Sequence, residues 1–187
     1  MIIRATNDNQ REEAQAAQFG LTLRSGRSNK YTPDADLLFD GTLLSAELKT
    51  FSPAKRAVST ARGVKQKKID DWREVDLWIF SAYAKGNALT GEHYVLTSTQ
   101  MEGFFQKMEV KLHQGSSKLA GLADWERAKE FLEQGNFEDS LLQKLDYAFR
   151  DKGCALNDPK IPLSYLIDNG TKIRNEKGLK TFLEGKR

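Results

Sequence analysis

The sequence has little of what several common classes of protein require. Its single cysteine, Cys154, excludes an internal disulfide and is typical of a reducing compartment. Its two histidines, His93 and His113, have no partner at metal-ligand spacing, so the sequence gives little support to a zinc site and both read as structural or surface residues. No apolar run approaches the roughly 18 residues of a membrane-spanning helix.

What the chain does contain is typical of one globular domain. Its 187 residues are 39% hydrophobic and 29% charged, enough for a sizeable core and too apolar for a disordered chain. The first residues, MIIRATNDNQREE, have too short an apolar part for a secretory signal, and acidic residues follow at once. We therefore expect a single domain over residues 1–187 and a cytoplasmic location.

The charge is distributed unevenly although the net charge is only +3. A basic stretch with two acidic residues, Asp70 and Asp71, carries Lys55, Arg56, Arg62, Lys65, Lys67, Lys68 and Arg73. Basic residues beside acidic ones suit a polyanionic substrate near a metal site. An ordinary solvated helix face is the alternative, and charge alone favours it.

Hydrophobic periodicity and turn signals divide the chain into helices and strands. The expected helices cover residues 9–19, 65–73, 99–111 and 122–149, the last broken near Gly135, with a short helix near the C-terminus. The expected strands cover residues 36–39, 43–51, 75–83 and 93–97, with a short extended piece at 21–23. This order predicts an α/β (α+β) fold, a mixed sheet flanked by helices with a helical insertion near 112–153.

The stretch PDADLLFDGTLLSAELK, residues 33–49, predicts a hairpin that turns at Asp40 and Gly41. Side chains alternate along a strand, so Glu47 and Lys49 share one face while Leu48 points to the core. A carboxylate at the end of the first strand can meet Glu47, and two carboxylates with a nearby lysine suit Mg²⁺ and water activation. The alternative is that the aspartates serve the turn and that Glu47 and Lys49 decorate the surface.

Four further segments occur in an order that resembles a known family. They are FGLTL (19–23), VSTARG (58–63), VDLWIFSAYAKG (75–86) and NDPKIPLSYLIDNGTKI (157–173). With the PD…ExK hairpin, they make the chain similar to the PD-(D/E)xK nuclease superfamily, and within it to PvuII-like type II restriction endonucleases. The resemblance implies a restriction-endonuclease-like mixed sheet core.

The resemblance also implies a catalytic set. It assigns Mg²⁺ to Asp36 and Glu47, with Lys49 assisting an attack by metal-bound water on the phosphodiester. Spacing favours Asp36 over Asp34, which is then a loop or supporting residue. Trp72 stands where the family has an active-site tyrosine, so a hydroxyl role there is lost.

Two carboxylates of the first helix are further candidates for the site. Asp8 falls near the position of a family aspartate close to the centre of the DNA site, and Glu13 is a helix carboxylate of the kind that many relatives bring to the metal. Whether Asp8 or Glu13 joins the site is left open, as is the number of metal ions, one or two.

The expected DNA contacts are Ser59, Arg62, Lys65, Asp158 and Lys160. The family's histidines are absent from the recognition segment, where Arg62 stands, and Asp158 replaces an asparagine before the proline. Arginine can pair with guanine and aspartate can accept from cytosine, so we expect a different recognition sequence. The alternatives are a phosphate contact for Arg62 and a turn hydrogen bond for Asp158.

These observations predict a Mg²⁺-dependent type II restriction endonuclease that cuts double-stranded DNA at a specific, palindromic sequence. A palindrome is usually cut by two copies of the enzyme, so we expect a homodimer. The family further implies a separately encoded DNA methyltransferase. Two alternatives stay open: a structure-specific nuclease, such as a junction resolvase or a repair nuclease, and a DNA-binding module with a decayed nuclease site.

Overall fold

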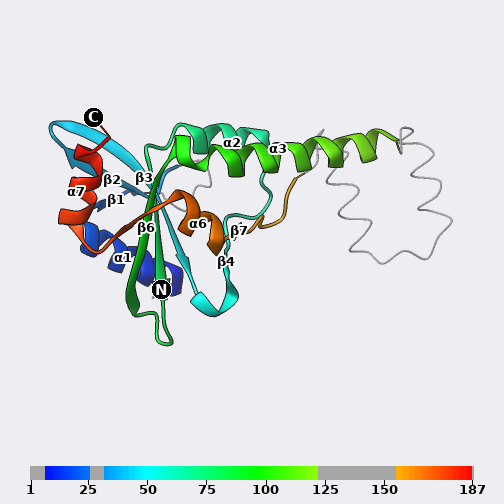
Figure 1. The fold of residues 1–187 in the computed structure, drawn as a ribbon. Helices are drawn as coiled ribbons and strands as arrows, with labels where there is room; N and C mark the ends of the chain where they lie inside the picture. The colour runs from blue at the N-terminus through cyan, green and yellow to red at the C-terminus, as the bar shows by residue number, and fades with distance from the viewer. Residues whose placement is uncertain (1–6, 26–31, 122–154, 187) are drawn as a thin grey trace.

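The computed structural model describes residues 7–25, 32–121 and 155–186, and Figure 1 shows their arrangement. The helices are α1 (Asn7–Phe19), η1 (Pro53–Lys55), α2 (Gln66–Arg73), α3 (Ser98–Gly121), α6 (Leu163–Asn169) and α7 (Glu176–Glu184). The strands are β1 (Thr22–Leu23), β2 (Ala35–Phe39), β3 (Thr42–Phe51), β4 (Ala57–Val58), β5 (Leu77–Tyr83), β6 (Leu89–Thr97), β7 (Ile161–Pro162) and β8 (Thr171–Ile173).

The main sheet is mixed, as the sequence predicts. Its strand order is β1-β2-β3-β5-β6-β8. Only β3 and β5 are parallel, and every other neighbouring pair in this sheet is antiparallel. Parallel neighbours need a crossover connection, and the segment that contains α2 supplies it. A separate two-stranded ribbon joins β4 to β7.

Helices cover both faces of the sheet, with α2 and α3 on one side and α1 and α7 on the other (Figure 1). Side chains alternate between the two faces of the sheet along β3. Ala46 and Leu48 point to one face and pack with residues of α1 and α7. On the opposite side, Trp72 of α2 and Phe105 of α3 form a second apolar cluster. The odd-numbered residues Glu47 and Lys49 therefore point toward the layer of α2 and α3.

Most of the expected elements occur, and their bounds differ in understandable ways. The strand expected at 93–97 begins at Leu89, because the hairpin after β5 pairs Tyr83 with Leu89. The helix expected at 99–111 runs on to Gly121 as α3, so residues 112–121 of the expected insertion continue this helix. The rest of the insertion, with the helices expected at 122–149, and Cys154 lie outside the described residues.

His93 is a core residue rather than a ligand of the site. Its Nδ1 lies 2.8 Å from the Ser81 hydroxyl oxygen. Its ring packs edge-on against the Phe19 ring, with the two ring centres 5.0 Å apart. The ring of His93 thus bridges β6, β5 and α1. Among the helices in the described ranges, none has the length and apolarity to cross a bilayer.

A charged cluster fastens α2 to α3. The Arg73 guanidinium donates to both carboxylate oxygens of Glu102 at 2.8 and 3.0 Å and to both oxygens of Glu109 at 2.6 and 2.8 Å. Hydrogen bonds from Arg73 and Gln66 lower the pKa of Glu109 from 4.5 to about 2. The cluster therefore stabilises the layer that carries Lys68 and Trp72.

This cluster gives a stability that depends on pH. The folded-state pKa of Glu109 lies below its unfolded value, so its contribution is complete above pH 4.5 and is lost as the pH falls toward 2. Because Arg73 and Glu109 are partly exposed, we expect their ion pair to contribute at most about 1 kcal/mol to the free energy of unfolding. Urea unfolding at pH 6 and at pH 3 gives the difference in the free energy of unfolding between the two pH values. Glu109→Gln should make that difference smaller by the contribution of Glu109. An unchanged difference in Glu109→Gln would contradict the assignment.

Candidate active site

The ammonium group of Lys49 lies among three oxygen atoms at the start of the β2–β3 hairpin. Its Nζ is 2.7 Å from Glu47 Oε1, 3.1 Å from the main-chain oxygen of Leu48 and 3.5 Å from Asp34 Oδ2. The hairpin register creates this cluster, because Ala35 pairs with Ala46 and so places Asp34 beside Glu47. The structure therefore brings Glu47 and Lys49 together as the sequence predicts.

Both carboxylates of the cluster are buried, which makes their charges costly without a partner. Asp34 is 8% exposed and Glu47 is 4% exposed. Burial raises the pKa of Asp34, and the charge of Glu47 raises it further, while Lys49 and the Leu48 amide lower it. The Leu48 amide donates to Asp34 Oδ2 at 2.8 Å, so the main chain of β3 fixes the orientation of this carboxylate.

Lys49 keeps its charge in this setting. Burial alone would lower the pKa of the Lys49 ammonium, but Glu47 and Asp34 outweigh burial and hold the pKa above its ordinary value. Lys49 also lines a cleft, whereas neither carboxylate does. The ammonium thus stands between the two carboxylates and the open cleft, in the position of a cation that neutralises them.

The structure corrects the choice of aspartate. Asp36 does not join the cluster; it forms a two-pronged ion pair with Arg24, whose Nε lies 2.8 Å from Oδ2 and whose Nη2 lies 2.5 Å from Oδ1. Asp34 and Asp36 share one side of the chain, but the register pairs Asp36 with Ser45, two residues before Glu47. Asp34, rather than Asp36, lies with Glu47 and Lys49.

Helix α2 closes the cluster from the other side. The indole Nε1 of Trp72 donates to Glu47 Oε1 at 3.2 Å, so Trp72 provides a donor although it lacks the hydroxyl of the family's tyrosine. Lys68, one helical turn earlier, is 6% exposed and its Nζ lies 5.0 Å from the centre of the Trp72 ring. Burial lowers the pKa of Lys68, while the charge of Glu47 opposes that effect.

The cleft in front of Lys49 is bounded by α1, β3 and the segment after β4. Its lining residues are Asp8, Arg11, Glu12, Gln15, Leu48, Lys49, Thr50, Ser59, Thr60 and Tyr83. Asp8, Glu12 and Gln15 are spaced three or four residues apart and so share one helix face. The structure therefore brings Glu12 to the cleft, and its charge raises the pKa of Lys49. The other acidic candidate, Glu13, is exposed and does not line the cleft.

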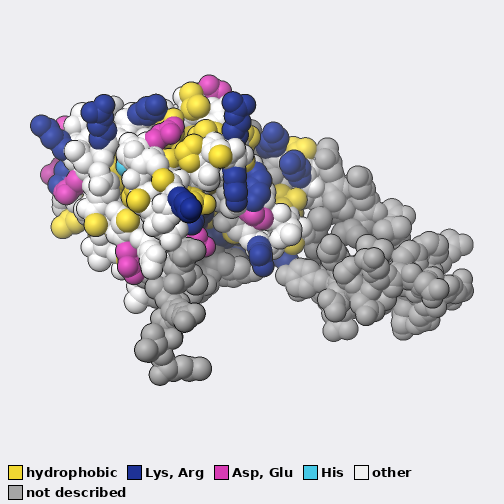
Figure 2. All heavy atoms as spheres, turned by 90° about the horizontal axis from the view of Figure 1, so that it is seen from below, with side chains coloured by type: hydrophobic (Ala, Val, Ile, Leu, Met, Phe, Trp, Pro, Cys, Tyr) yellow, Lys and Arg dark blue, Asp and Glu magenta, His cyan; other side chains and the backbone are white. Residues whose placement is uncertain are grey.

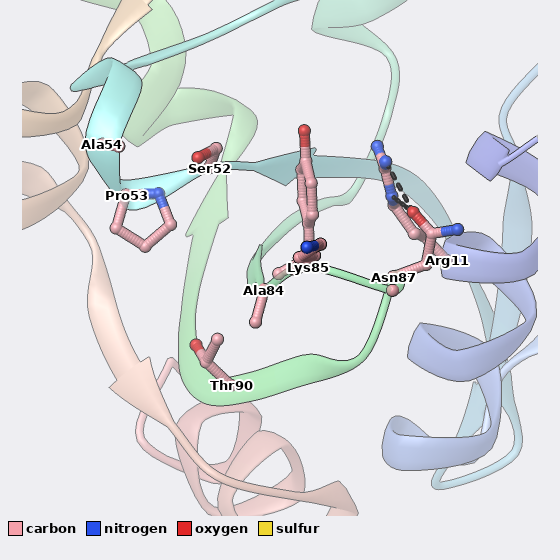
Figure 3. Close-up of a pocket in the computed structure, with 10 residues that line it drawn as sticks. Arg11, Ser52, Pro53, Ala54, Ala84, Lys85, Asn87 and Thr90 are labelled. Atoms are coloured by element: carbon pink, nitrogen blue, oxygen red, sulfur yellow. Dashed lines mark hydrogen bonds between the residues drawn. The ribbon is translucent and has the colours of Figure 1, made fainter.

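A second hollow adjoins the cleft and shares Arg11 and Tyr83 with it. Figure 3 shows Arg11 bonded to Asn87, with Lys85, Ser52 and Pro53 around the hollow. The Arg11 guanidinium donates to Asn87 Oδ1 at 2.7 and 2.9 Å and lies 3.5 Å from the centre of the Tyr83 ring. The residues that line this hollow include two cations and no carboxylate. It therefore extends the cleft toward a surface that suits a polyanion.

The β4–β7 ribbon holds three of the residues expected to contact DNA. Lys160 Nζ donates to Ser59 Oγ at 2.7 Å and forms an ion pair with Asp158. Asp158 Oδ1 accepts from the Thr60 amide at 2.9 Å, a hydrogen bond between two distant segments of the chain rather than the local turn bond considered for Asp158. Desolvation works against the Asp158 carboxylate, but these donors hold its pKa below the ordinary value.

The other two expected DNA contacts lie on the segment that leads into α2. Arg62 is exposed, and Lys65 is the partly buried residue before the helix. Figure 2 shows the molecule from below the view of Figure 1, where Lys and Arg side chains are spread over the face with carboxylates among them. Such a surface is open to a polyanionic ligand on this side of the molecule.

The donor set is compatible with Mg²⁺. An ammonium cation already lies among oxygens of Asp34, Glu47 and the Leu48 main chain, so these atoms form a place of favourable potential for a cation. In the described part of the chain there is no group of three or more Asp, Glu, His or Cys side chains that could hold a metal ion. Two carboxylates and a carbonyl still suit Mg²⁺, because this ion keeps several of its waters.

Because Asp34 rather than Asp36 lies beside Glu47 and Lys49, we expect the asparagine variants of these two aspartates to behave differently. Asp34→Asn keeps an oxygen for the Leu48 amide but removes a charge from the cluster. If Mg²⁺ binds at these oxygens, this variant should bind it at least about tenfold more weakly. Asp36→Asn should leave Mg²⁺ affinity nearly unchanged, because it alters only the contact with Arg24. Isothermal titration of each variant with Mg²⁺ measures this, and equal losses in both would contradict the reassignment.

Comparisons with known proteins add no family to this description. No protein-family model matches the chain, and no curated protein matches its sequence at a significant level. What is established is a mixed six-stranded sheet flanked by helices and a buried cluster of Asp34, Glu47 and Lys49 at its centre. Function must therefore be argued from the chemistry of that cluster and of the surface around it.

Proposed function

We propose that this protein is a Mg²⁺-dependent endonuclease for double-stranded DNA, of the type II restriction class. The observation that carries the proposal is the Lys49 ammonium held by Asp34, Glu47 and the Leu48 carbonyl on a β-hairpin. Two buried carboxylates and a lysine that faces a cleft are the groups that metal-assisted hydrolysis of a phosphodiester needs.

The topology supports the same proposal. A helix, a three-stranded antiparallel meander, a crossover helix and a parallel strand follow one another as α1, β1–β3, α2 and β5. The sequence resemblance to the PD-(D/E)xK superfamily implies a mixed core of this kind, with the acidic cluster on the central hairpin. We therefore propose that the sheet is a restriction-endonuclease-like core, with Asp34 in the role first given to Asp36.

In this proposal each residue of the cluster has a role that follows from its position. Asp34 and Glu47 would hold Mg²⁺ together with the Leu48 carbonyl, and the ion would supply a Lewis acid and a water of lowered pKa when bound. Lys49 lines the cleft in which the DNA phosphate would lie. Its ammonium would there orient the attacking water and oppose the negative charge that develops on the phosphate. The Trp72 indole keeps Glu47 in place.

The surrounding surface suits the DNA backbone. Arg11 joins the cleft to the hollow that Lys85 also lines, and Lys160, the residue before β7, contacts Ser59, which lines the cleft. Lysine and arginine at such positions neutralise phosphates and make affinity depend on salt. Asp158 is engaged with Thr60 and Lys160, so the exposed Arg62 is the stronger candidate for reading a base.

The activity is tested by digesting long phage DNA and a supercoiled plasmid in the presence of Mg²⁺. We expect discrete fragments from the unaltered protein, none in EDTA, and a cleavage rate at least about 100-fold lower for Lys49→Ala, because a transition-state donor is lost. Lys180→Ala is the matched control, because Lys180 pairs with Glu176 on α7 and lines neither the cleft nor the adjoining hollow, and it should leave cleavage close to that of the unaltered protein. DNA that is bound but never cut would contradict the proposal, and selective cutting of branched DNA would indicate a structure-specific nuclease.

The role of Arg62 is tested on the fragments that this digestion defines. If Arg62 pairs with guanine, Arg62→Ala should lower affinity for the cognate site by roughly 1–3 kcal/mol and leave non-specific binding little changed. Fluorescence anisotropy with cognate and scrambled duplexes gives both affinities. An equal loss on both duplexes would make Arg62 a phosphate contact.

A further inference from the structure

Lys68 is a buried lysine whose position the proposed function does not use. It lies on the inner side of α2, is 6% exposed, and rests against Trp72. Lysine is almost never buried to this extent without a partner of opposite charge. Among the described residues, no carboxylate forms a close ion pair with Lys68 as Glu47 does with Lys49. Its burial therefore calls for another source of compensation.

That compensation comes from the acidic cluster at longer range. The charges that act on Lys68 include the carboxylates of Glu47 and Asp34 in its favour, and the ammonium of Lys49 against it. Trp72 connects the two parts, because its indole donates to Glu47 while its ring faces the Lys68 ammonium. Glu47 thus contacts the edge of the Trp72 ring at Nε1, while Lys68 lies over the face of the same ring.

The group consists of two buried carboxylates, Asp34 and Glu47, with the buried Lys68 and the partly exposed Lys49, and the formal charges of these four side chains cancel. The charges of Glu12 and Asp71 act on the two lysines from outside this group. A divalent cation added to the group leaves an excess of positive charge, which the low local dielectric makes unfavourable. A phosphodiester brings one negative charge and reduces that excess.

We propose that Lys68 is a resident counter-cation of this site, which balances Asp34 and Glu47 in the free protein, weakens binding of the divalent cation and strengthens binding of the DNA phosphate. This inference rests on the proposed function and assigns to Lys68 a positioning role through Glu47. It adds no covalent step, because Lys68 acts only through its charge. A purely structural role would not give opposite effects on the two ligands.

The test compares four proteins at pH 7: the unaltered chain, Lys68→Met, Lys68→Arg and Lys67→Met. Lys67 is the matched control, because it is the preceding residue of α2, its side chain is 67% exposed and it pairs with Asp71 on the surface. Methionine keeps the length and apolar packing of the lysine stem, and thermal unfolding checks that each variant is folded. Two affinities are then measured, that for Mg²⁺ by titration calorimetry and that for a labelled duplex in EDTA by fluorescence anisotropy.

We expect Lys68→Met to bind Mg²⁺ about tenfold more tightly than the unaltered protein, the order expected when one unit charge leaves a partly buried site. Its affinity for the duplex should fall severalfold, while Lys68→Arg and Lys67→Met stay close to the unaltered protein for Mg²⁺. Unchanged or weaker Mg²⁺ binding by folded Lys68→Met would overturn the inference and leave the proposed function standing. An unaltered protein that binds neither Mg²⁺ nor DNA would overturn both.

Discussion

The need to neutralise two buried carboxylates governs the centre of this protein. Asp34 and Glu47 are both inside the molecule, where an isolated charge costs far more than in water. Lys49 meets that need directly, and the Leu48 amide and the Trp72 indole donate the remaining hydrogen bonds. Because the groups that satisfy the carboxylates come from β3 and α2, the hairpin and the crossover helix have to pack together for the site to exist.

The apolar layers provide that packing. Trp72 contacts the rings of Trp78 and Phe105, and so joins α2 to β5 and α3. The Arg73 cluster adds polar contacts between α2 and α3 at the surface of the same layer. The helix that carries Lys68 is thus held by apolar rings on its inner side and by ion pairs at its rim. A site made of charges is in this way supported by contacts that do not depend on its own ionisation.

The sequence correctly predicts which residues lie together where this follows from the alternation of side chains along a strand. It does not predict which residues lie together where this depends on strand register or on the orientation of a helix. Glu47 and Lys49 sit two residues apart on a strand, so their common face follows from the period of a β-strand. Choosing between Asp34 and Asp36 requires the pairing of β2 with β3 and the position of Arg24, and neither is visible in the spacing. Glu12 and Glu13 differ by one residue, about 100° around a helix, and the weak apolar pattern of α1 does not fix which one faces inward.

Other features leave a signal that one sequence does not separate from ordinary surface charge. Lys68 lies in a basic stretch with Lys65 and Lys67, and only the packing of α2 against β3 and α3 shows that it is buried. The Leu48 carbonyl belongs to the main chain, so no residue type reveals it as part of the cluster. By contrast, the segments that resemble restriction endonucleases lead to Ser59, Asp158 and Lys160, which the structure does bring together.

The β4–β7 ribbon is a sheet of its own, and this has a consequence for how such a protein diversifies. One side of the cleft, with Lys49, belongs to the main sheet, while Ser59 and Thr60 follow a strand of the ribbon. Thr60 binds Asp158 and Pro159 within the ribbon segments, and Val58 and Ile161 anchor the ribbon in the apolar cluster that contains Trp72. Substitutions there can alter what is held in the cleft without disturbing the strands that position the charges. Under the proposed function, selectivity and chemistry therefore depend on separate pieces of backbone, so that one can be altered without the other.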